Sequence, residues 1–404
     1  MKVTIEKGVA RGEITAPPSK SVAHRLLISA ALADGKSIVR GVSDCEDVRA
    51  TVRCLRALGA EFEVNGCDYT VFGINTHNIK SSALFDCGES GSTLRFIFPI
   101  ASLFAKSATF IGAGRLMQRP MSVYENIFRE RGLYYNSDGE KITSKGALSA
   151  GEYCVPGNLS SQFISGLIFA LPLLEGDSYI KITPPIESAS YINLTLDAVR
   201  RFGIEAYFVD EFTVKIPGSQ IYRPADVTVE GDYSGAAFIE ALNLFSGSVK
   251  VLGLNPESLQ GDRIYKEHFK LMKNGALTIN IDNCPDSGPI YFAVAAALNG
   301  AKFTGTRRLK IKESDRAAAM AEELSKFGVK TEIYEDSVVI HKTALKSPTQ
   351  TLFSHNDHRI VMSLSVLLTL VGGEIEGAEA IKKSYPDFFD ALTKLGIGVL
   401  RNDT

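Results

Sequence analysis

The sequence repeats one order of secondary structure six times, and this repeat is the feature that most constrains the fold. Each segment is predicted to begin with an apolar helix, continue with a short strand that usually ends in glycine, and close with a second helix before another strand. Glycine at each close is typical of the left-handed residue that follows a helix. Successive closing glycines lie about 70 residues apart, with one interval near 50, a period longer than that of a solenoid. The closing glycines are Gly59, Gly132, Gly203, Gly275, Gly328 and Gly396.

Six such units in 404 residues predict an α/β protein of two domains with three units each. A chain of this length is too long for one compact core. Proline residues mark two crossings, at Pro17–Pro18 and at Tyr222–Pro224. We therefore expect one domain of residues 1–16 and 228–404, a second of residues 17–227, and hinge crossings near 16–18 and 222–228.

The first helix of every unit begins at a residue type that favours the helix N-cap. A helix N-terminus carries about half a positive charge and unpaired N–H groups, so it attracts anions. By symmetry the three starts of one domain should point the same way, and two facing domains would direct six starts into one cleft. Such a cleft suits a small ligand with several negative charges. The starts are Ser19–Ser21, Ser90–Ser92, Ser160–Ser161, Asp232–Ser234, Asp286–Ser287 and Asn356–Asp357.

Polar residues gather beside these starts. Lys20 and Arg25 add two cations to the first one, where Ser19 or Ser21 is expected to cap a helix that stops at Gly35. A glycine-rich turn precedes the second start, followed by a loop that carries Arg115 and Arg119. An ordinary capped surface helix remains the alternative for each stretch taken alone.

In the second half, carboxylates and cations alternate over short distances. Asp286 lies at a helix start, and one predicted turn holds Lys312, Glu313, Asp315 and Arg316, where Asp315 has an alternative role as a simple cap. A His-x-x-His pair, His355 and His358, is one short motif for zinc, but it has no Cys or Glu companions in sequence. We therefore predict no metal.

Composition excludes several classes of function. Lys and Arg number 44 against 46 Asp and Glu, so no basic excess points to nucleic acid. The six cysteines are scattered without paired spacing, which favours reduced thiols in the cytoplasm. The longest apolar run, Val361–Val371, is too short to span a bilayer, and the first residues lack the apolar core of a signal peptide.

These motifs, taken together and in order along the whole chain, resemble the 5-enolpyruvylshikimate-3-phosphate synthase family. The resemblance implies a two-domain inside-out α/β barrel in which each domain has three βαβαββ repeats and the helix N-termini face the interdomain cleft. The matching motifs are Pro18-Ser19-Lys20-Ser21 with Arg25, Gly91 with Arg95, Arg119-Pro120, Ser160-Ser161-Gln162, Asp286, Lys312-Glu313 with Asp315-Arg316, Asp357-His358-Arg359, and Lys383 with Pro386-Asp387.

The resemblance also implies a reaction and a set of site residues. The enolpyruvyl group of phosphoenolpyruvate would pass to the 5-hydroxyl of shikimate 3-phosphate by addition and elimination, with release of phosphate and without metal or cofactor. The expected acid–base residues are Lys20, Asp286 and Glu313. Expected contacts to shikimate 3-phosphate are Lys20, Ser21, Arg25, Ser160, Ser161, Gln162, Ser188, Asp286, Lys312 and Arg308, with Tyr191 nearby. Expected contacts to phosphoenolpyruvate are Lys20, Gly91, Arg119, Gln162, Arg316, Arg359 and Lys383.

The chain departs from the family pattern at three positions, Glu89, His24 and Arg308, each of which stands where asparagine is common. A carboxylate at Glu89 would repel phosphoenolpyruvate unless it turned away or met a cation.

Two alternatives stay open at this stage. The sister transferase acts on UDP-N-acetylglucosamine and carries a reactive cysteine in the loop that is here Arg115–Arg119, which has none. A non-catalytic anion-binding protein of the same fold would not need both Asp286 and Glu313 beside the cations. We expect a cytoplasmic monomer that binds these small molecules and neither nucleic acid nor membrane.

Overall fold

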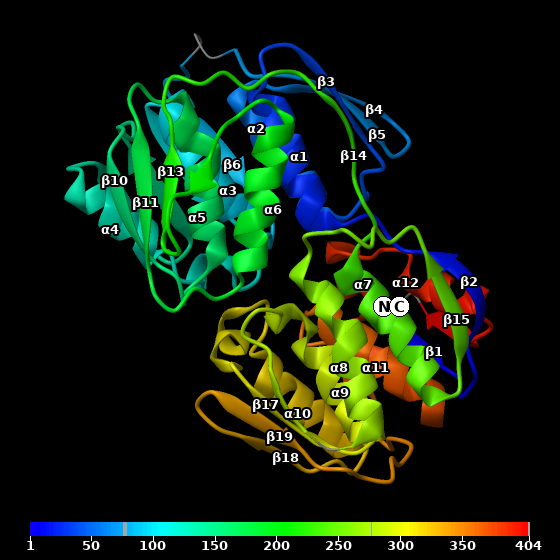
Figure 1. Ribbon diagram of the computed structural model, residues 1–404. Coiled ribbons are helices and arrows are strands. Elements are labelled where there is room, and N and C mark those ends of the chain that lie inside the picture. Colours follow the sequence, from blue (N-terminus) through cyan, green and yellow to red (C-terminus); the bar gives the residue numbers. More distant parts are fainter. Residues whose placement is uncertain (76–78, 276, 403–404) are drawn as a thin grey trace. The chain divides into compact units, whose positions relative to one another are not determined.

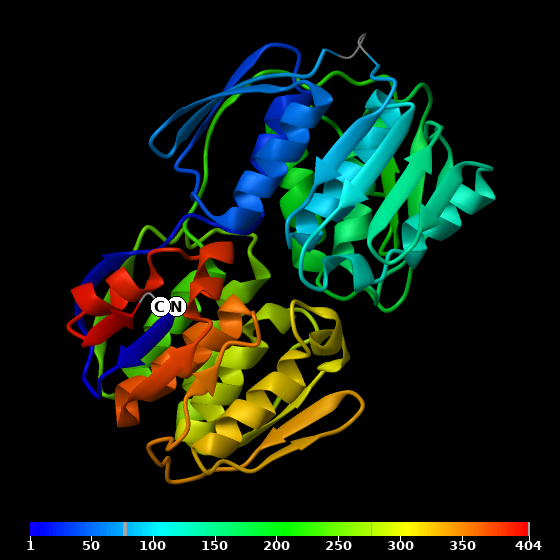
Figure 2. The same ribbon diagram turned by 180° about the vertical axis from the view of Figure 1, so that it is seen from behind.

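The computed structural model describes residues 1–75, 79–275 and 277–402, and the chain divides into two compact units. Unit 1 contains Met1–Pro17 and Gly231–Thr404, and unit 2 contains Pro18–Glu230. In both units the sheets lie on the outside and cover helices in the interior (Figures 1 and 2). Each unit has its own buried apolar core, as expected of a separate folding unit.

Unit 2 is built from three copies of one pattern, in which a buried central helix is followed by a strand, a second helix and a hairpin. The central helices, α1, α3 and α5, are almost wholly buried because apolar residues occupy nearly every face. The helices are α1 (Lys20–Leu32), α2 (Glu46–Leu58), α3 (Gly91–Phe104), α4 (Ser122–Glu130), α5 (Ser161–Ala170) and α6 (Ala189–Arg201), with short 3-10 turns η1 (Leu116–Gln118) and η2 (Leu171–Leu173). The strands are β3 (Lys36–Arg40), β4 (Glu61–Asn65), β5 (Asp68–Phe72), β6 (Ala83–Asp86), β7 (Ser107–Ile111), β8 (Tyr134–Ser137), β9 (Lys141–Lys145), β10 (Glu152–Pro156), β11 (Ser178–Thr183), β12 (Tyr207–Phe208), β13 (Thr213–Ile216) and β14 (Asp226–Thr228).

The three sheets of unit 2 share one topology. Their orders are β14-β3-β5-β4, β6-β7-β9-β8 and β10-β11-β13-β12. In each sheet the first two strands are parallel and the hairpin strands are antiparallel. A helical crossover joins each parallel pair within the second and third sheets, as parallel pairing requires.

Unit 1 repeats the pattern, and its own buried central helices are α7, α9 and α11. Its helices are α7 (Tyr233–Ala241), α8 (Tyr265–Asn274), α9 (Gly288–Ala297), α10 (Arg316–Lys326), α11 (His358–Val371) and α12 (Phe388–Lys394), with 3-10 turns η3 (Leu242–Phe245), η4 (Gly261–Ile264), η5 (Pro285–Ser287), η6 (Arg307–Ile311) and η7 (Ala378–Lys383). Its strands are β1 (Lys2–Ile5), β2 (Arg11–Thr15), β15 (Ser248–Leu252), β16 (Thr278–Asn280), β17 (Ala301–Thr304), β18 (Thr331–Ile333), β19 (Ser337–Ile340), β20 (Leu352–Phe353), β21 (Gly373–Glu376) and β22 (Val399–Asn402).

One repeat of unit 1 is short, and this explains the interval near 50 residues between Gly275 and Gly328. Helix α8 ends at Asn274 and β16 begins at Thr278, so no room remains for the hairpin that closes the other repeats. The sheet of this repeat accordingly has two strands, β15 paired in parallel with β2. The other N-terminal strand, β1, lies between β21 and β22 in a different sheet of the unit.

The predicted repeat is confirmed at each predicted strand, and its closing glycines have the expected left-handed backbone except Gly275, which has φ 152° and ψ 176°. Gly59, for example, has φ 110° at the C-cap of α2, and Gly328 has φ 84° after α10. Other details were also wrong. Helix α1 ends at Leu32 rather than at Gly35, and Ser19 occupies its N-cap position without a side-chain bond to the first turn. At the fifth start a 3-10 turn contains Asp286, and α9 begins only at Gly288.

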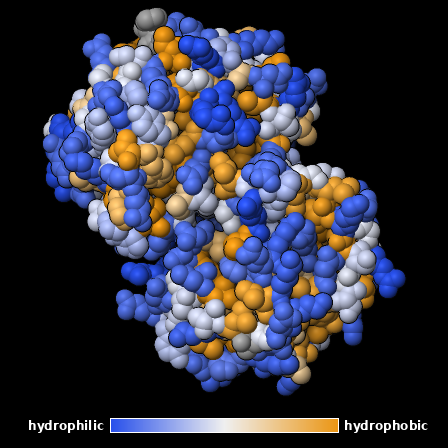
Figure 3. All heavy atoms as spheres, viewed as in Figure 1, coloured by the Kyte–Doolittle hydropathy of each residue, from blue (hydrophilic) through white to orange (hydrophobic). Residues whose placement is uncertain are grey.

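Exposed charged residues are distributed over the surface, and Figure 3 shows apolar residues interspersed among hydrophilic ones on the face in view. Among the described residues, no helix is both long and apolar enough to cross a membrane.

Candidate active site

In unit 2, the starts of the first three helices are joined around Lys20 and Asp47. The Lys20 ammonium lies 2.7 Å from the Asp47 carboxylate at the start of α2, and both side chains are mostly buried. The Thr93 hydroxyl in the first turn of α3 donates to the Asp47 carbonyl at 3.4 Å. Lys20, at the first position of α1, therefore binds the carboxylate of a residue whose backbone carbonyl is bonded to α3.

Arg25, one turn further along α1, is a buried cation. Its guanidinium donates to Thr195 Oγ1 at 2.8 Å, to the Ser21 carbonyl at 2.7 Å and to the Tyr191 carbonyl at 3.1 Å. It also lies over the rings of Phe96 and Tyr191. Burial lowers the pKa of Arg25 to about 10, against an opposing effect of Tyr191, so it stays cationic at neutral pH. The sequence-predicted group of Ser21, Arg25 and Tyr191 thus lies together.

Gln162 joins the starts of α3 and α5. Its amide oxygen accepts from Arg95 Nη1 at 2.7 Å, and its amide nitrogen donates to Ser92 Oγ at 2.9 Å. Arg95 also donates to the Pro120 carbonyl at 3.0 Å and lies over the Phe163 ring. Both ends of the Gln162 amide are therefore fixed by unit 2 itself, which holds the side chain at the helix starts.

Gly91 lies directly against the guanidinium of Arg119. A Cβ placed on Gly91 would meet Arg119 Nη1 at 2.7 Å, so this first residue of α3 allows the arginine to reach the backbone. Ser160 caps α5 by accepting from the Gln162 N–H at 3.3 Å, and Ser161 begins that helix. Ser188, fully buried, takes a left-handed conformation (φ 58°) at the N-cap of α6.

In unit 1, Arg359 brings the three first-helix starts together. Its Nη1 donates to Ser234 Oγ at 2.7 Å and to the Asp286 carbonyl at 2.9 Å, while Arg359 itself lies in the first turn of α11. Ser234 belongs to α7, and Asp286 precedes α9. The expectation that the helix starts within one domain converge is confirmed here by direct contacts.

Asp286 and Arg316 form the centre of a buried ionic cluster. One Asp286 oxygen lies 3.0 Å from Lys312 Nζ and 2.7 Å from Arg316 Nη1. The Arg316 guanidinium also donates to Glu313 Oε2 at 2.7 Å and to Asp357 Oδ2 at 2.8 Å. Arg316 and Asp357 are almost completely shielded from water, so the pairs are short and fully formed.

The cluster shifts the protonation of its members in opposite directions. Burial works against ionisation of Asp286, yet Lys312, Arg359 and Arg316 hold its pKa well below the usual range. For Lys312, burial outweighs the attraction of Asp286, and Arg308 and Arg316 add to the effect, so its pKa falls to about 8. The carboxylate is therefore permanently charged, and the ammonium titrates close to neutrality.

The remaining cations lie at the edge of this cluster. Lys383, in the turn η7, donates from Nζ to the Asn356 carbonyl at 2.5 Å, just before α11. Arg308 is buried and donates to the Asp282 carbonyl at 3.4 Å. Asp315, for which a capping role was an alternative, does cap α10 by accepting from the Ala318 N–H at 3.1 Å.

The structure also shows the surroundings of His24 and Glu89, the other two departures from the family pattern. His24 is fully buried, with Nδ1 2.7 Å from Thr51 Oγ1 and its ring edge-on to Phe96, so it serves the packing of α1. The Glu89 carboxylate lies against Gly114, where a Cβ would collide with it. The carboxylate is thus directed toward the loop after β7.

Unit 1 also contains a group of potential metal ligands, and unit 2 contains a large cavity; neither is formed by the predicted site residues. Glu322, Glu323 and His355 have ligand atoms within 4.8 Å of one another, so the histidine does have acidic neighbours, which its sequence surroundings did not reveal. His358 is not part of this group. A cavity of about 980 Å³ in unit 2 is lined by residues after α1, α3 and η2 and by none of the predicted site residues.

Sequence reasoning did not identify Asp47, and it named Asp357, Ser234 and Arg95 without assigning them partners in the site. In the sequence, Asp47 looks like an ordinary acidic residue in the first turn of a helix. Asp357 looks like an ordinary N-cap residue. Ser234 looked like part of a cap, and Arg95 was matched without a partner. The pairing of each with a cation or an amide depends on contacts between different repeats, which spacing within one repeat does not reveal.

Two units of three βα repeats, each with charged side chains at converging helix starts, define a class of anion-binding α/β proteins. Residues 6–392 match the family described as EPSP synthase (3-phosphoshikimate 1-carboxyvinyltransferase). The chain belongs to this family of transferases.

Relatives and solved structures agree with the assignment. The chain is 38% identical to 3-phosphoshikimate 1-carboxyvinyltransferase of Clostridium kluyveri, over 98% of this chain and 97% of that protein. It is 40% identical to the protein of that name from Clostridium botulinum strain Alaska E43, over 97% and 96% of the two chains. The EPSP synthase structure from Acinetobacter baumannii superposes with a TM-score of 0.78 at 23% identity, over 99% of this chain and 100% of that chain. This confirms the predicted fold class and family.

Proposed function

We propose that this chain transfers the enolpyruvyl group of phosphoenolpyruvate to the 5-hydroxyl of shikimate 3-phosphate and releases phosphate. The observation that carries the proposal is the cluster around Asp286 and Arg316 in a chain whose family membership extends over residues 6–392. A substrate pair with two phosphates and two carboxylates needs cations at fixed positions, and one proton must be removed from the attacking hydroxyl.

Shikimate 3-phosphate is assigned to the hydroxyl and amide groups of unit 2 and to part of the cluster of unit 1. Arg25 offers a planar fork suited to a carboxylate, although its described bonds are to neutral groups. Helix starts with serine hydroxyls suit a phosphate. The proposed contacts are Lys20, Ser21, Arg25, Ser160, Ser161, Gln162, Ser188, Asp286, Lys312 and Arg308.

Phosphoenolpyruvate is assigned to a second set of residues, mostly cations, which shares Lys20 and Gln162 with the first set. Arg316 and Arg359 would hold its carboxylate, because both guanidinium groups lie beside Asp286, the proposed proton acceptor. Lysine ammonium groups and backbone N–H groups would hold its phosphate. The proposed contacts are Lys20, Gly91, Arg119, Gln162, Arg316, Arg359 and Lys383.

The proposed chemistry begins when a proton is added to the methylene carbon of phosphoenolpyruvate, which makes C2 electrophilic. The 5-hydroxyl attacks C2 and loses its proton, giving a tetrahedral ketal phosphate. A proton then leaves the methyl group as the C2–O bond to phosphate breaks. The Asp286 carboxylate is ionised and can accept the proton of the 5-hydroxyl, although its lowered pKa makes it a weak base. Glu313 and Lys20 are the other proton carriers that we propose, without an assignment of steps.

We also propose that no metal or cofactor takes part, that the protein is a cytoplasmic monomer, and that residues 16–18 and 222–228 form a hinge. The six cysteines lack paired spacing along the sequence, which supports a reducing compartment. Mass measured by light scattering tests the oligomeric state.

The deciding experiment is release of inorganic phosphate from phosphoenolpyruvate by the purified protein. Release that requires shikimate 3-phosphate supports the proposal, and release that requires UDP-N-acetylglucosamine would assign the sister activity. Folded protein that binds shikimate 3-phosphate in calorimetry but releases no phosphate would be an anion-binding protein instead. The Glu313→Gln variant gives the control, because it should bind and not turn over.

A further inference from the structure

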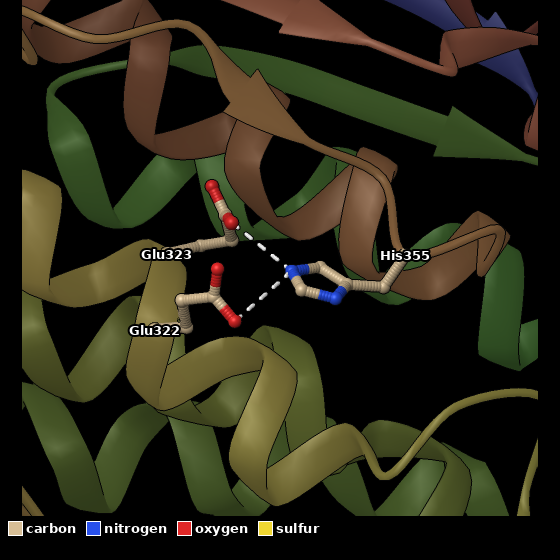
Figure 4. Close-up of side chains that lie close together, drawn as sticks. All are labelled: Glu322, Glu323 and His355. Atoms are coloured by element: carbon tan, nitrogen blue, oxygen red, sulfur yellow. Dashed lines mark hydrogen bonds and ion pairs between the residues drawn. The ribbon is translucent and has the colours of Figure 1, made fainter.

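Glu323 is a fully buried carboxylate with an unusually complete set of hydrogen-bond donors. It lies near the end of α10 and accepts two bonds from Lys326 Nζ, both of 2.9 Å. The backbone N–H of Phe353 donates to it at 3.0 Å, and His355 Nε2 lies 3.0 Å from its other oxygen. Figure 4 shows the side chains of Glu323 and His355 directed toward each other across the space between α10 and the loop before α11.

The hydrogen bonds of Glu323 to Phe353 and His355 connect it to a turn with an unusual backbone. His355 and Asn356 both have left-handed backbones, with φ 49° and 53°, although neither is glycine. Asparagine adopts such a conformation readily, but at His355 it costs about 1–3 kcal/mol and persists only where surrounding contacts enforce it. The His355 ring on Glu323 is one such contact, and the bond from the Asn356 N–H to Ser354 Oγ, at 3.1 Å, is another.

The same turn connects directly to the proposed phosphoenolpyruvate contacts. The Asn356 carbonyl accepts from Lys383 Nζ, and the next residue, Asp357, caps α11 and binds Arg316 Nε at 2.8 Å. Helix α10 therefore holds both ends of the turn, through Arg316 at its first residue and Glu323 seven residues later. Positions separated by seven residues lie on one face of a helix.

A metal ion is the alternative occupant of this cluster, and the contacts argue against it. The Lys326 ammonium already binds both oxygens of Glu323, so a divalent cation would have to displace a fixed positive charge. Glu322, the third possible ligand, is well exposed and lies 4.0 Å from His355. The described contacts fit an anchor for the turn better than a metal site.

We propose that Glu323 and His355 are a positioning pair that fixes the turn at 354–357 and thereby places Lys383 and Arg359 for phosphoenolpyruvate. The inference rests on the proposed function and extends it. Neither residue of the pair takes part in proton transfer. We expect their effect to be largest for phosphoenolpyruvate, because the contacts described for the turn lead to Lys383, Arg316 and Arg359, which are assigned to that substrate.

The test compares KM values for the two substrates in Glu323→Gln, His355→Asn and the control Glu322→Gln. Asparagine tolerates the left-handed backbone but is too short to reach Glu323, so His355→Asn removes the contact and keeps the turn geometry accessible. We expect KM for phosphoenolpyruvate to rise about tenfold in the first two variants, the loss expected of a charge-assisted hydrogen bond. KM for shikimate 3-phosphate should stay within about twofold, and the Glu322→Gln control should match the parent protein.

Each other outcome has a definite meaning. Equal KM values for phosphoenolpyruvate in His355→Asn and the parent, or a matching rise for both substrates, would overturn the positioning role. His355 lies in a loop, so this variant decides the question even where Glu323→Gln fails to fold. Activity that is lost with a chelator and restored by zinc would assign the cluster to a metal instead. A parent protein that releases no phosphate would refute the proposed function, which is a different failure.

Discussion

The lowered pKa of Lys312 gives a quantitative prediction for the pH dependence of activity. With a pKa of about 8, the ammonium is about 90% charged at about pH 7 and about 10% charged at about pH 9. An ordinary lysine would remain almost fully charged over this range. Charge is present below the pKa and is lost as pH rises, so binding of the shikimate 3-phosphate dianion should weaken. We expect kcat/KM for shikimate 3-phosphate to fall about tenfold between about pH 7 and about pH 9.

The measurement is initial phosphate release at low shikimate 3-phosphate and saturating phosphoenolpyruvate across this pH range. The substrate phosphate has its second pKa near 6 and stays dianionic, so it contributes no slope of its own. The variant Lys312→Arg keeps its charge at every pH tested and should give a flat profile, whatever its absolute rate. A flat profile for the parent protein, or an equal fall in Lys312→Arg, would refute the reasoning.

Three further predictions follow from buried contacts. Asp357→Asn should lower the free energy of unfolding by about 1.5–3 kcal/mol in urea titration because buried Arg316 loses one of its three carboxylate partners, whereas Asp336→Asn, in an exposed pair, should change it by less than about 1 kcal/mol. A comparable loss in both would show that burial is not the cause. Glu313→Gln should reduce kcat by about 10²-fold or more and leave calorimetric binding of shikimate 3-phosphate intact; unchanged kcat would remove Glu313 from proton transfer. Gly91→Ala should raise KM for phosphoenolpyruvate by displacing Arg119, with little change in melting temperature, and an unchanged KM would place Arg119 away from that substrate.

The repeat was the part of the fold most open to prediction from sequence. Closing glycines and short apolar strands depend on local backbone requirements, and the sequence of each repeat contains these local signals. The missing hairpin after α8 appeared in the sequence as a short interval, but the pairing of β15 with β2 in this repeat was not predicted. Pairing between strands distant in sequence is not encoded in either strand alone.

The candidate site was predictable in its cations and less so in its carboxylate partners. Lysine and arginine residues beside helix starts are an unusual pattern, so Lys20, Lys312 and Arg316 were identified. Asp47 and Glu323 were not, because an acidic residue in a helix resembles a solvated surface residue until burial is known. Their contacts to Lys20 and to His355 join different segments, and so required the tertiary structure.

The placement of β1 and β2 has a consequence for the order in which the protein folds during synthesis. Unit 2 is one continuous stretch, Pro18–Glu230, and can form its core as soon as that stretch has left the ribosome. Strand β2 cannot pair until β15 has been made, and β1 cannot pair until β21 and β22, much later in the sequence, have been made. Strands β1 and β2 are therefore made before unit 2 but find their partners only after it, so unit 1 is the second of the two units to be completed.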